Sequence, residues 1–258
     1  MSHVDELIEN LRAPDQRGMG RVERVENGVT SIDRLAALEA HAKTIRAWDQ
    51  QAIPGLLQTP RYSAAVIQVA NPRLPAMEVR RRMLLKSART EAFLTRTRVR
   101  GLGMAWFVIG ESAIVHSFRD QEETHALQLR HLLTMSGHAK VMIQVLPAHK
   151  IPAGLADHFT LYGLEEDKAD PDTGSRLPTK RVGFLETIMG DWYSTRLDDL
   201  AALHSAFSEL IRDAMTPEAS RTFIREVLAS WRATQRTTSP EPTMGNPSSS
   251  PATPTGDA

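Results

Sequence analysis

The chain has 258 residues, of which 41% are hydrophobic and 24% charged, so it can bury a substantial core in one domain or two small ones. Its 31 Lys and Arg balance 31 Asp and Glu, and this excludes a global field that would attract nucleic acid or an acidic membrane. It contains no cysteine, which excludes disulfides, thiolate zinc sites and cysteine nucleophiles. The N-terminus lacks a secretory signal pattern, and no apolar run approaches the roughly 20 residues that span a bilayer. We therefore expect a cytoplasmic protein without a membrane partner.

Residues 1–33 form a polar segment in which only one short helix, around residues 4–11, is expected. This segment is too short and too polar to hold the packed helices of a complete helix-turn-helix. A helical part is predicted over residues 34–100. Its apolar residues recur at three- and four-residue steps as far as Pro54, and this spacing predicts one helix up to that proline. The residues are Leu35, Leu38, Ala42, Ile45 and Trp48.

A second helix is predicted to begin after this corner, with Thr59 as its N-cap and Pro60 in its first turn. The sequence 71–75 contains two prolines and breaks the pattern again, and a third helix is expected over about residues 76–95. This third helix and its exit are rich in arginine. A nucleic-acid patch is one interpretation, but no aromatic residues interleave to stack bases. We favour a solvated face whose arginines pair with acidic neighbours.

Residues 101–232 read as an α+β part. Short apolar or alternating runs predict strands over 104–109, 141–146, 158–162 and 181–186. Helices are expected over 111–115, from Asp120 to about Gly137, over 195–214, and from Thr216–Pro217 onwards. Residues 165–178 read as a loop or hairpin excursion. Residues 233–258 are rich in Pro, Ser and Thr and are predicted to be a disordered tail. The fold class is therefore α+β: an N-terminal helical region, a small mixed β-sheet and two long C-terminal helices.

No catalytic signature is present: the chain lacks a P-loop, a His-Glu-x-x-His motif, a complete dinucleotide fingerprint and a Gly-x-Ser-x-Gly elbow. No pair of histidines has the spacing that places two metal ligands on one helical face, so we expect no metal and no cofactor. Polar groups at strand ends remain. They could converge on a cavity, or they could cap helices and satisfy backbone donors. The candidate ligand-binding residues are Trp106, Glu111, Gln144, His158, Tyr162 and Glu186, and the candidates for acid–base catalysis are Glu111, His116, His158 and Glu186.

Several segments resemble one known family in combination. They are Leu38-Glu39 with Ala42, the string Ile53-Pro54-Gly55-Leu56-Leu57-Gln58-Thr59 with Tyr62, residues 80–84, the Glu111 segment, Gln144-Val145-Leu146-Pro147, Phe159, residues 182–186, and the string 214–220. This set is similar to the effector domain that follows the DNA-binding domain in actinobacterial WhiJ-like helix-turn-helix regulators. The resemblance covers residues 34–232. It implies a ligand- or partner-sensing domain in the control of development and specialised metabolism, and it supplies no catalytic residues.

Members of that family carry a helix-turn-helix of some 70–80 residues before this domain, whereas this sequence has 33 residues there. Our first hypothesis is a stand-alone effector that binds a small metabolite or a small partner protein without contacting DNA. The alternative is a cofactor-free enzyme of specialised metabolism, a cyclase or lyase for example, that uses a recruited sensor pocket. A DNA-binding regulator is the third hypothesis, and we do not expect it. The sequence leaves open the ligand, the reaction and homodimer formation.

Overall fold

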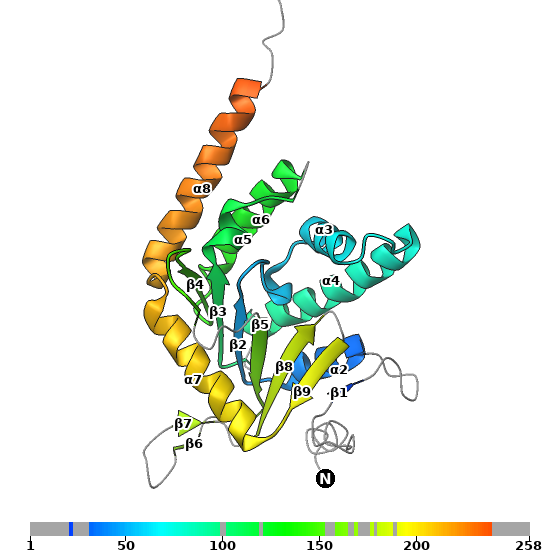
Figure 1. Cartoon of the computed structure of the whole chain (residues 1–258), viewed down its shortest axis with the longest axis vertical. Coiled ribbons are helices and arrows are strands. Elements are labelled where there is room, and N and C mark those ends of the chain that lie inside the picture. Colours follow the sequence, from blue (N-terminus) through cyan, green and yellow to red (C-terminus); the bar gives the residue numbers. More distant parts are fainter. Residues whose placement is uncertain are drawn as a thin grey trace, which may run out of the picture.

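The structure is a computed structural model (Figure 1). It describes residues 21–22, 31–98, 102–118, 121–152, 158–164, 168–169, 176–177, 180–187 and 190–238. Its helices are α2 (Ser31–His41), the 3-10 turn η1 (Gly55–Leu57), α3 (Pro60–Ala70), α4 (Ala76–Arg98), α5 (Glu111–Val115), α6 (Glu122–Met135), α7 (Leu197–Asp213) and α8 (Pro217–Thr238). Its strands are β1 (Arg21–Val22), β2 (Thr44–Asp49), β3 (Met104–Gly110), β4 (Val141–Leu146), β5 (His158–Gly163), β6 (Lys168–Ala169), β7 (Arg176–Leu177), β8 (Arg181–Thr187) and β9 (Gly190–Ser194).

A mixed seven-stranded sheet with the order β1-β9-β8-β5-β2-β3-β4 forms the centre of the described chain. Strands β2, β3 and β4 are parallel, and the pairs on the other side of β2 are antiparallel. One face carries the main core, to which α2, η1, α3, α4, α6 and α8 contribute buried or partly buried residues. The opposite face packs on α7 through a smaller cluster that includes Trp48, Val108 and Phe207. The α+β prediction is confirmed.

Strand β2 corrects the expectation of a single helix from Leu35 to the Pro54 corner. The helix ends at His41, and Ile45 and Trp48 belong to a strand that runs between β5 and β3. Ile45 packs in the main core, whereas Trp48 packs in the cluster beneath α7. An interior strand that is buried on both faces has apolar side chains on both faces. Ile45 and Trp48 are three residues apart, and this spacing is also typical of one face of a helix. The predicted helical part 34–100 therefore contains an interior strand of the same sheet that the α+β part completes.

Most other predicted elements are confirmed within a few residues. These include α3, α4, α5, α6, α7, α8 and the strands β3, β4, β5 and β8. Strand β9 was not predicted, and α8 continues to Thr238, into the predicted tail. The short strands β6 and β7 pair within the predicted hairpin excursion. The predicted helix at 4–11 and the proposed cap Asp120 lie outside the described residues, and Gln121 occupies the N-cap position of α6.

The Pro54 corner is fixed by side-chain hydrogen bonds to its backbone. Thr59 caps α3 as predicted, because its hydroxyl accepts a hydrogen bond from the Tyr62 amide at 3.4 Å. Gln128 of α6 clamps the corner from the other side: its Nε2 donates to the Leu57 carbonyl at 2.7 Å and its Oε1 accepts from the Thr59 amide at 2.7 Å. Gln128 is fully buried. The corner between β2 and α3 is thus held by one amide side chain from another helix.

Replacement of Gln128 by leucine tests this clamp. The Gln128→Leu variant leaves a buried carbonyl and a partly buried amide without partners, and we expect it to lower the free energy of unfolding by about 2–4 kcal/mol. Urea unfolding followed by circular dichroism measures the change. The control is Gln68→Leu on the exposed side of α3, which should change stability by no more than about 0.5 kcal/mol. Equal stability of the two variants would show that the clamp is not needed.

Candidate functional site

Three titratable side chains lie on neighbouring interior strands, at the edge of the sheet that the ends of these strands form. Asp49 ends β2, His158 begins β5 and Glu186 lies near the end of β8. Asp49 and His158 are direct partners in the β2–β5 register. The β5–β8 register pairs Thr160 with Phe184, and the same alternation places His158 and Glu186 two residues further along. The structure therefore places two candidate residues from the sequence analysis, His158 and Glu186, close to Asp49, which was not a candidate. These three residues and Lys86, described below, are called the edge cluster.

Asp49 is held in a tight turn at the end of β2. Its Oδ1 accepts hydrogen bonds from the amides of Gln51 at 3.0 Å and Ala52 at 2.9 Å. Burial nevertheless raises the pKa of the Asp49 carboxyl above its usual value, although these hydrogen bonds and the charge of His158 act in the opposite direction. The charge of Glu186 raises it further. Asp49 is thus a carboxyl group whose protonated form is favoured by its surroundings.

Lys86 of α4 lies over this edge of the sheet. Its ammonium makes one hydrogen bond, from Nζ to Gln58 Oε1 at 3.4 Å, and within the described part of the chain it has no ion pair within 4.0 Å. Burial lowers the pKa of Lys86, and the nearby charge of Glu186 is the largest influence that opposes this shift. Arg89 lowers the pKa as well, whereas Asp49 and Glu39 raise it. A partly buried ammonium with one long hydrogen bond retains donor capacity that a ligand could use.

Beside the edge cluster, a complete ion pair joins α2 to α4. The Arg89 guanidinium donates to both carboxylate oxygens of Glu39, at 2.7 Å and 2.5 Å. The Tyr162 hydroxyl donates to the same carboxylate at 3.4 Å. Burial raises the pKa of Tyr162 well above its usual value, and the charge of Glu39 adds to this effect. Tyr162 is therefore a neutral hydrogen-bond donor to Glu39.

The remaining candidates lie elsewhere. Trp106 donates from Nε1 to Gln144 Oε1 at 2.7 Å, and Trp106 packs on the α7 side of the sheet. The Gln144 amide donates in turn to the Met215 carbonyl at 2.7 Å, which ties β4 to the start of α8. Glu111 accepts a hydrogen bond from the Ala148 amide at 2.8 Å. His116 is exposed, and its Nδ1 lies 3.1 Å from the Ser112 carbonyl. The structure does not bring these four side chains into the edge cluster.

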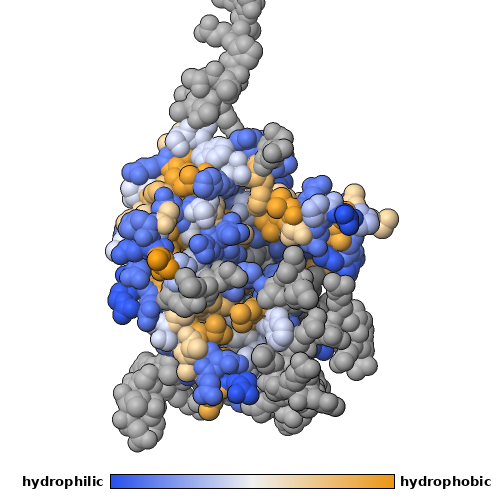
Figure 2. All heavy atoms as spheres, viewed as in Figure 1, coloured by the Kyte–Doolittle hydropathy of each residue, from blue (hydrophilic) through white to orange (hydrophobic). Residues whose placement is uncertain are grey.

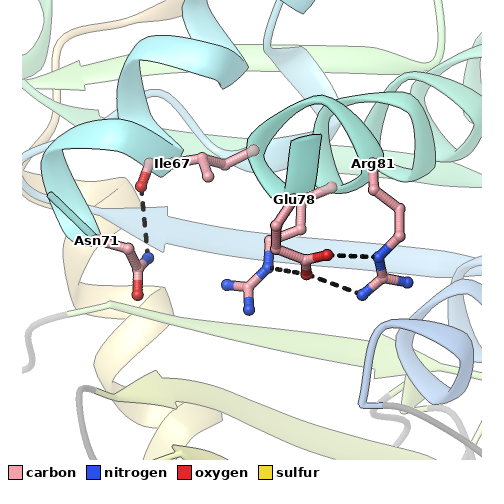
Figure 3. Close-up of polar contacts among 5 residues, drawn as sticks. Ile67, Asn71, Glu78 and Arg81 are labelled. Carbon is pink, nitrogen blue, oxygen red and sulfur yellow. Dashed lines mark hydrogen bonds and ion pairs between the residues drawn. The ribbon is translucent and has the colours of Figure 1, made fainter. Parts of the chain in front are cut away.

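The arginines of α4 have mostly intramolecular partners. Glu78 accepts hydrogen bonds from both Arg81 and Arg82, at 2.7–2.9 Å, at the start of the helix (Figure 3). These two arginines lower the pKa of Glu78 to about 2. Arg96 donates to the carbonyls of Glu39 and Ala42 at the end of α2. Arg81, Arg82 and Arg89 thus pair with acidic neighbours, as predicted for this helix.

A shallow hollow of about 210 Å³ lies between α2 and α4. Four of its ten lining residues are alanines, and the Glu39–Arg89 ion pair is also part of the lining. Pockets that enclose drug-sized ligands have about 300–1,000 Å³.

Among the described residues no group of three or more potential ligands could hold a metal ion. None of the helices in that same part of the chain combines the length and the apolar character needed to cross a membrane.

Sequence reasoning missed Asp49, Lys86 and the Glu39–Arg89 pair for different reasons. Asp49 was missed because β2 was predicted as part of a helix, and the alternation of polar and apolar residues over 44–47 was the signal that could have revealed the strand. Lys86 and Arg89 were grouped with the basic surface, although their spacing of three residues places both on the side of α4 that carries the buried Phe93. Glu39 and Arg89 are 50 residues apart, and no local pattern connects them.

A double-mutant cycle tests the ion pair between α2 and α4. Arg89→Met leaves a buried carboxylate at Glu39, and we expect it to lower the free energy of unfolding by about 3–5 kcal/mol. The double variant Glu39→Leu/Arg89→Met removes both charges, and its stability should return to within about 1 kcal/mol of the wild type. Chemical denaturation of the four proteins gives the coupling energy. Additive losses in the double variant would contradict a buried pair at this position.

Comparison with known proteins identifies the domain but not its activity. A family model described as a domain of unknown function (DUF5753) matches residues 32–226. No curated protein and no solved structure gives a significant match to the chain. The match includes α2 to α7 and the first half of α8, and thus both the edge cluster and the Glu39–Arg89 ion pair. The chain therefore belongs to the DUF5753 family.

Proposed function

We propose that this domain is an effector module that binds a small polar metabolite at the edge cluster, in the control of specialised metabolism or development. The observation that carries the proposal is the state of Lys86: a partly buried ammonium with a single hydrogen bond of 3.4 Å, opposite Asp49 and Glu186. Desolvation makes such a group unfavourable for the empty protein. A ligand that accepts its protons would relieve this penalty, and the relief would add to the affinity.

The composition of the edge cluster indicates the chemistry of the ligand. Lys86 requires an acceptor such as a carboxylate, phosphate or carbonyl oxygen, while Asp49 and Glu186 would accept hydrogen bonds from hydroxyl or amino groups. The His158 ring offers nitrogen atoms that can donate or accept a hydrogen bond. A metabolite with both an oxygen acceptor and hydroxyl or amino donors would satisfy the whole set. The resemblance to WhiJ-like effector domains supports a sensing role, and the internal pairing of the α4 arginines supports action without direct DNA contact.

The Lys86→Met variant separates binding from folding. Methionine keeps most of the length of the side chain without its charge, so we expect the variant to be more stable than the wild type by about 1 kcal/mol at neutral pH. The same variant should lose the metabolite that native mass spectrometry detects on wild-type protein isolated from the cells that produce it. A less stable variant that retains the metabolite would contradict a binding role for Lys86, and wild-type protein without any retained metabolite would contradict the proposed function.

The stability difference also depends on pH in a defined direction. Because burial lowers the pKa of Lys86, the folded state releases this proton at a lower pH than the unfolded state, whose value is 10.5. The wild type therefore gains stability relative to Lys86→Met as the pH rises from the lowered pKa to 10.5. We expect the gap in melting temperature to be largest near neutral pH and to narrow towards pH 10.5. A gap that is constant over this range would show that the charge of Lys86 is not its cause.

A cofactor-free enzyme remains the second candidate, and one observation favours it. The pKa of Asp49 is raised and that of Lys86 is lowered, so both groups approach the range in which a proton donor and acceptor operate at neutral pH. Asp49→Asn keeps the hydrogen-bonding oxygen at the turn but cannot release a proton. An enzyme would retain the bound metabolite in this variant and accumulate it in the cells in place of a product. A sensor would show the same metabolite profile in variant and wild-type cells.

A further inference from the structure

The side of α4 that faces away from the sheet carries large apolar side chains in solvent. Met77 is 84% exposed and Leu84 is 57% exposed, and they are two helical turns apart on the same side of the helix. Val69, at the end of α3, is 60% exposed. In Figure 1, α3 and α4 project from the body of the molecule, and in Figure 2 this projection carries hydrophobic and hydrophilic residues side by side. We call Met77, Leu84, Ala88 and Ala92 the outer face of α4.

The outer face continues into the hollow between α2 and α4. Two alanines four residues apart on each helix line it, Ala36 and Ala40 on α2 and Ala88 and Ala92 on α4. Small side chains at this spacing let the backbone of a third helix approach closely. From Met77 to Ala92 the outer face extends about 22 Å, which is the length of a helix of about four turns. The dimensions match a docked helix better than a small molecule, since the hollow of about 210 Å³ is shallow.

The positive charge around this surface indicates what kind of partner helix would bind to it. Helices α2 and α4 contain eight Lys and Arg against four Asp and Glu, in a chain with zero net charge. Arg73 and Arg80 border the outer face and are exposed, and neither has an ion pair with any described residue. A second copy of this chain would bring the same positive charges into apposition and be repelled. Nucleic acid would meet Met77 and Leu84, which offer no aromatic ring for stacking.

We propose that the outer face of α4, together with the alanine-lined hollow against α2, binds an acidic amphipathic helix of a partner protein. Met77 and Leu84 contact the apolar side of that helix, the alanines admit its backbone, and Arg73 and Arg80 pair with its carboxylates. Helix-in-groove binding of this kind uses apolar anchors at helical spacing with a charged rim. This interaction does not depend on the metabolite site, which lies on the opposite side of α4.

Site-specific photocrosslinking in the cells that produce the protein tests the proposal. A benzoylphenylalanine is placed at Met77 or at Leu84 in the full chain, and the crosslinked segment is identified by mass spectrometry. The expected adduct is a segment of another protein that carries acidic residues and has apolar residues at three- and four-residue steps. The matched control is the same photoprobe at Leu197, which is 82% exposed at the start of α7 and should not give this adduct.

A charge-reversal variant distinguishes binding that depends on the arginine charges from nonspecific binding to the apolar side chains. Arg73→Glu/Arg80→Glu should reduce the Leu84 adduct at least tenfold, whereas Arg225→Glu on the exposed side of α8 should leave it unchanged. The crosslinked segment, made as a labelled peptide, should bind the purified full chain in fluorescence anisotropy, with weaker binding at higher salt. An adduct to a second copy, an adduct to nucleic acid, a segment without acidic residues, or the absence of any adduct would each overturn the proposal.

Discussion

The buried ion pair between Glu39 and Arg89 is the constraint on which the arrangement of this domain depends. Glu39 lies in the last turns of α2, which leads directly into β2, and Arg89 lies in the second half of α4. The pair therefore fixes the long helix relative to a strand that neighbours β3 and β5. Tyr162 of β5 reaches the same carboxylate from the sheet. Three elements that are distant in the sequence meet at one carboxylate, and the C-terminal end of α2 is held further by Arg96.

The same helix also holds charges that are not satisfied in this way. Glu39 and Arg89 are matched by geometry, so their desolvation is offset by two short hydrogen bonds. Lys86, one turn earlier, has a single long hydrogen bond, and the pKa of nearby Asp49 is raised by burial. A fold selected for stability alone would replace such a lysine by an apolar side chain. Arg89 makes two short hydrogen bonds to a carboxylate, whereas Lys86 makes one long hydrogen bond to an amide oxygen, and this contrast is why we place the ligand site at Lys86 and not at Arg89.

Local sequence patterns predicted those parts of the fold that local physics determines. Pro54, Thr59 and Pro60 define the end of one element and the start of the next by steric and capping effects, and the structure has α3 at that place. The alternation of residues 158–162 and 181–186 likewise predicted β5 and β8, whereas the pairing that places His158 near Glu186 is a finding of the structure. Gly190–Ser194 was missed because its polar residues and its glycine weaken the alternation, and this strand forms through pairing with β8.

The parts that could not be predicted depend on tertiary contacts. Whether Ile45 and Trp48 share one helical face or alternate across a sheet is decided by the strands on both sides of them. Gln144, like Glu186, is a polar residue of a predicted strand, yet it faces α7 and the segment before α8. Only the packing of the two helices shows that its hydrogen bonds are already satisfied. The sequence could identify polar candidates, but the choice between a structural and a functional role required their partners.

Helix α4 gives the two proposed sites a common physical element. Lys86 lies on its inner side, and Met77 and Leu84 lie about half a helical turn away, on the outer side. The C-terminal half is anchored by Arg89 and by the buried Phe93, whereas the N-terminal half is exposed along Met77 and Arg80 and packs mainly on α3. A ligand that binds Lys86 acts where the anchored half gives way to the exposed half. The two proposed sites therefore use different sides of one helix: the metabolite site uses the side of Lys86, which packs towards the sheet, and the partner site uses the side of Met77 and Leu84, which lies in solvent.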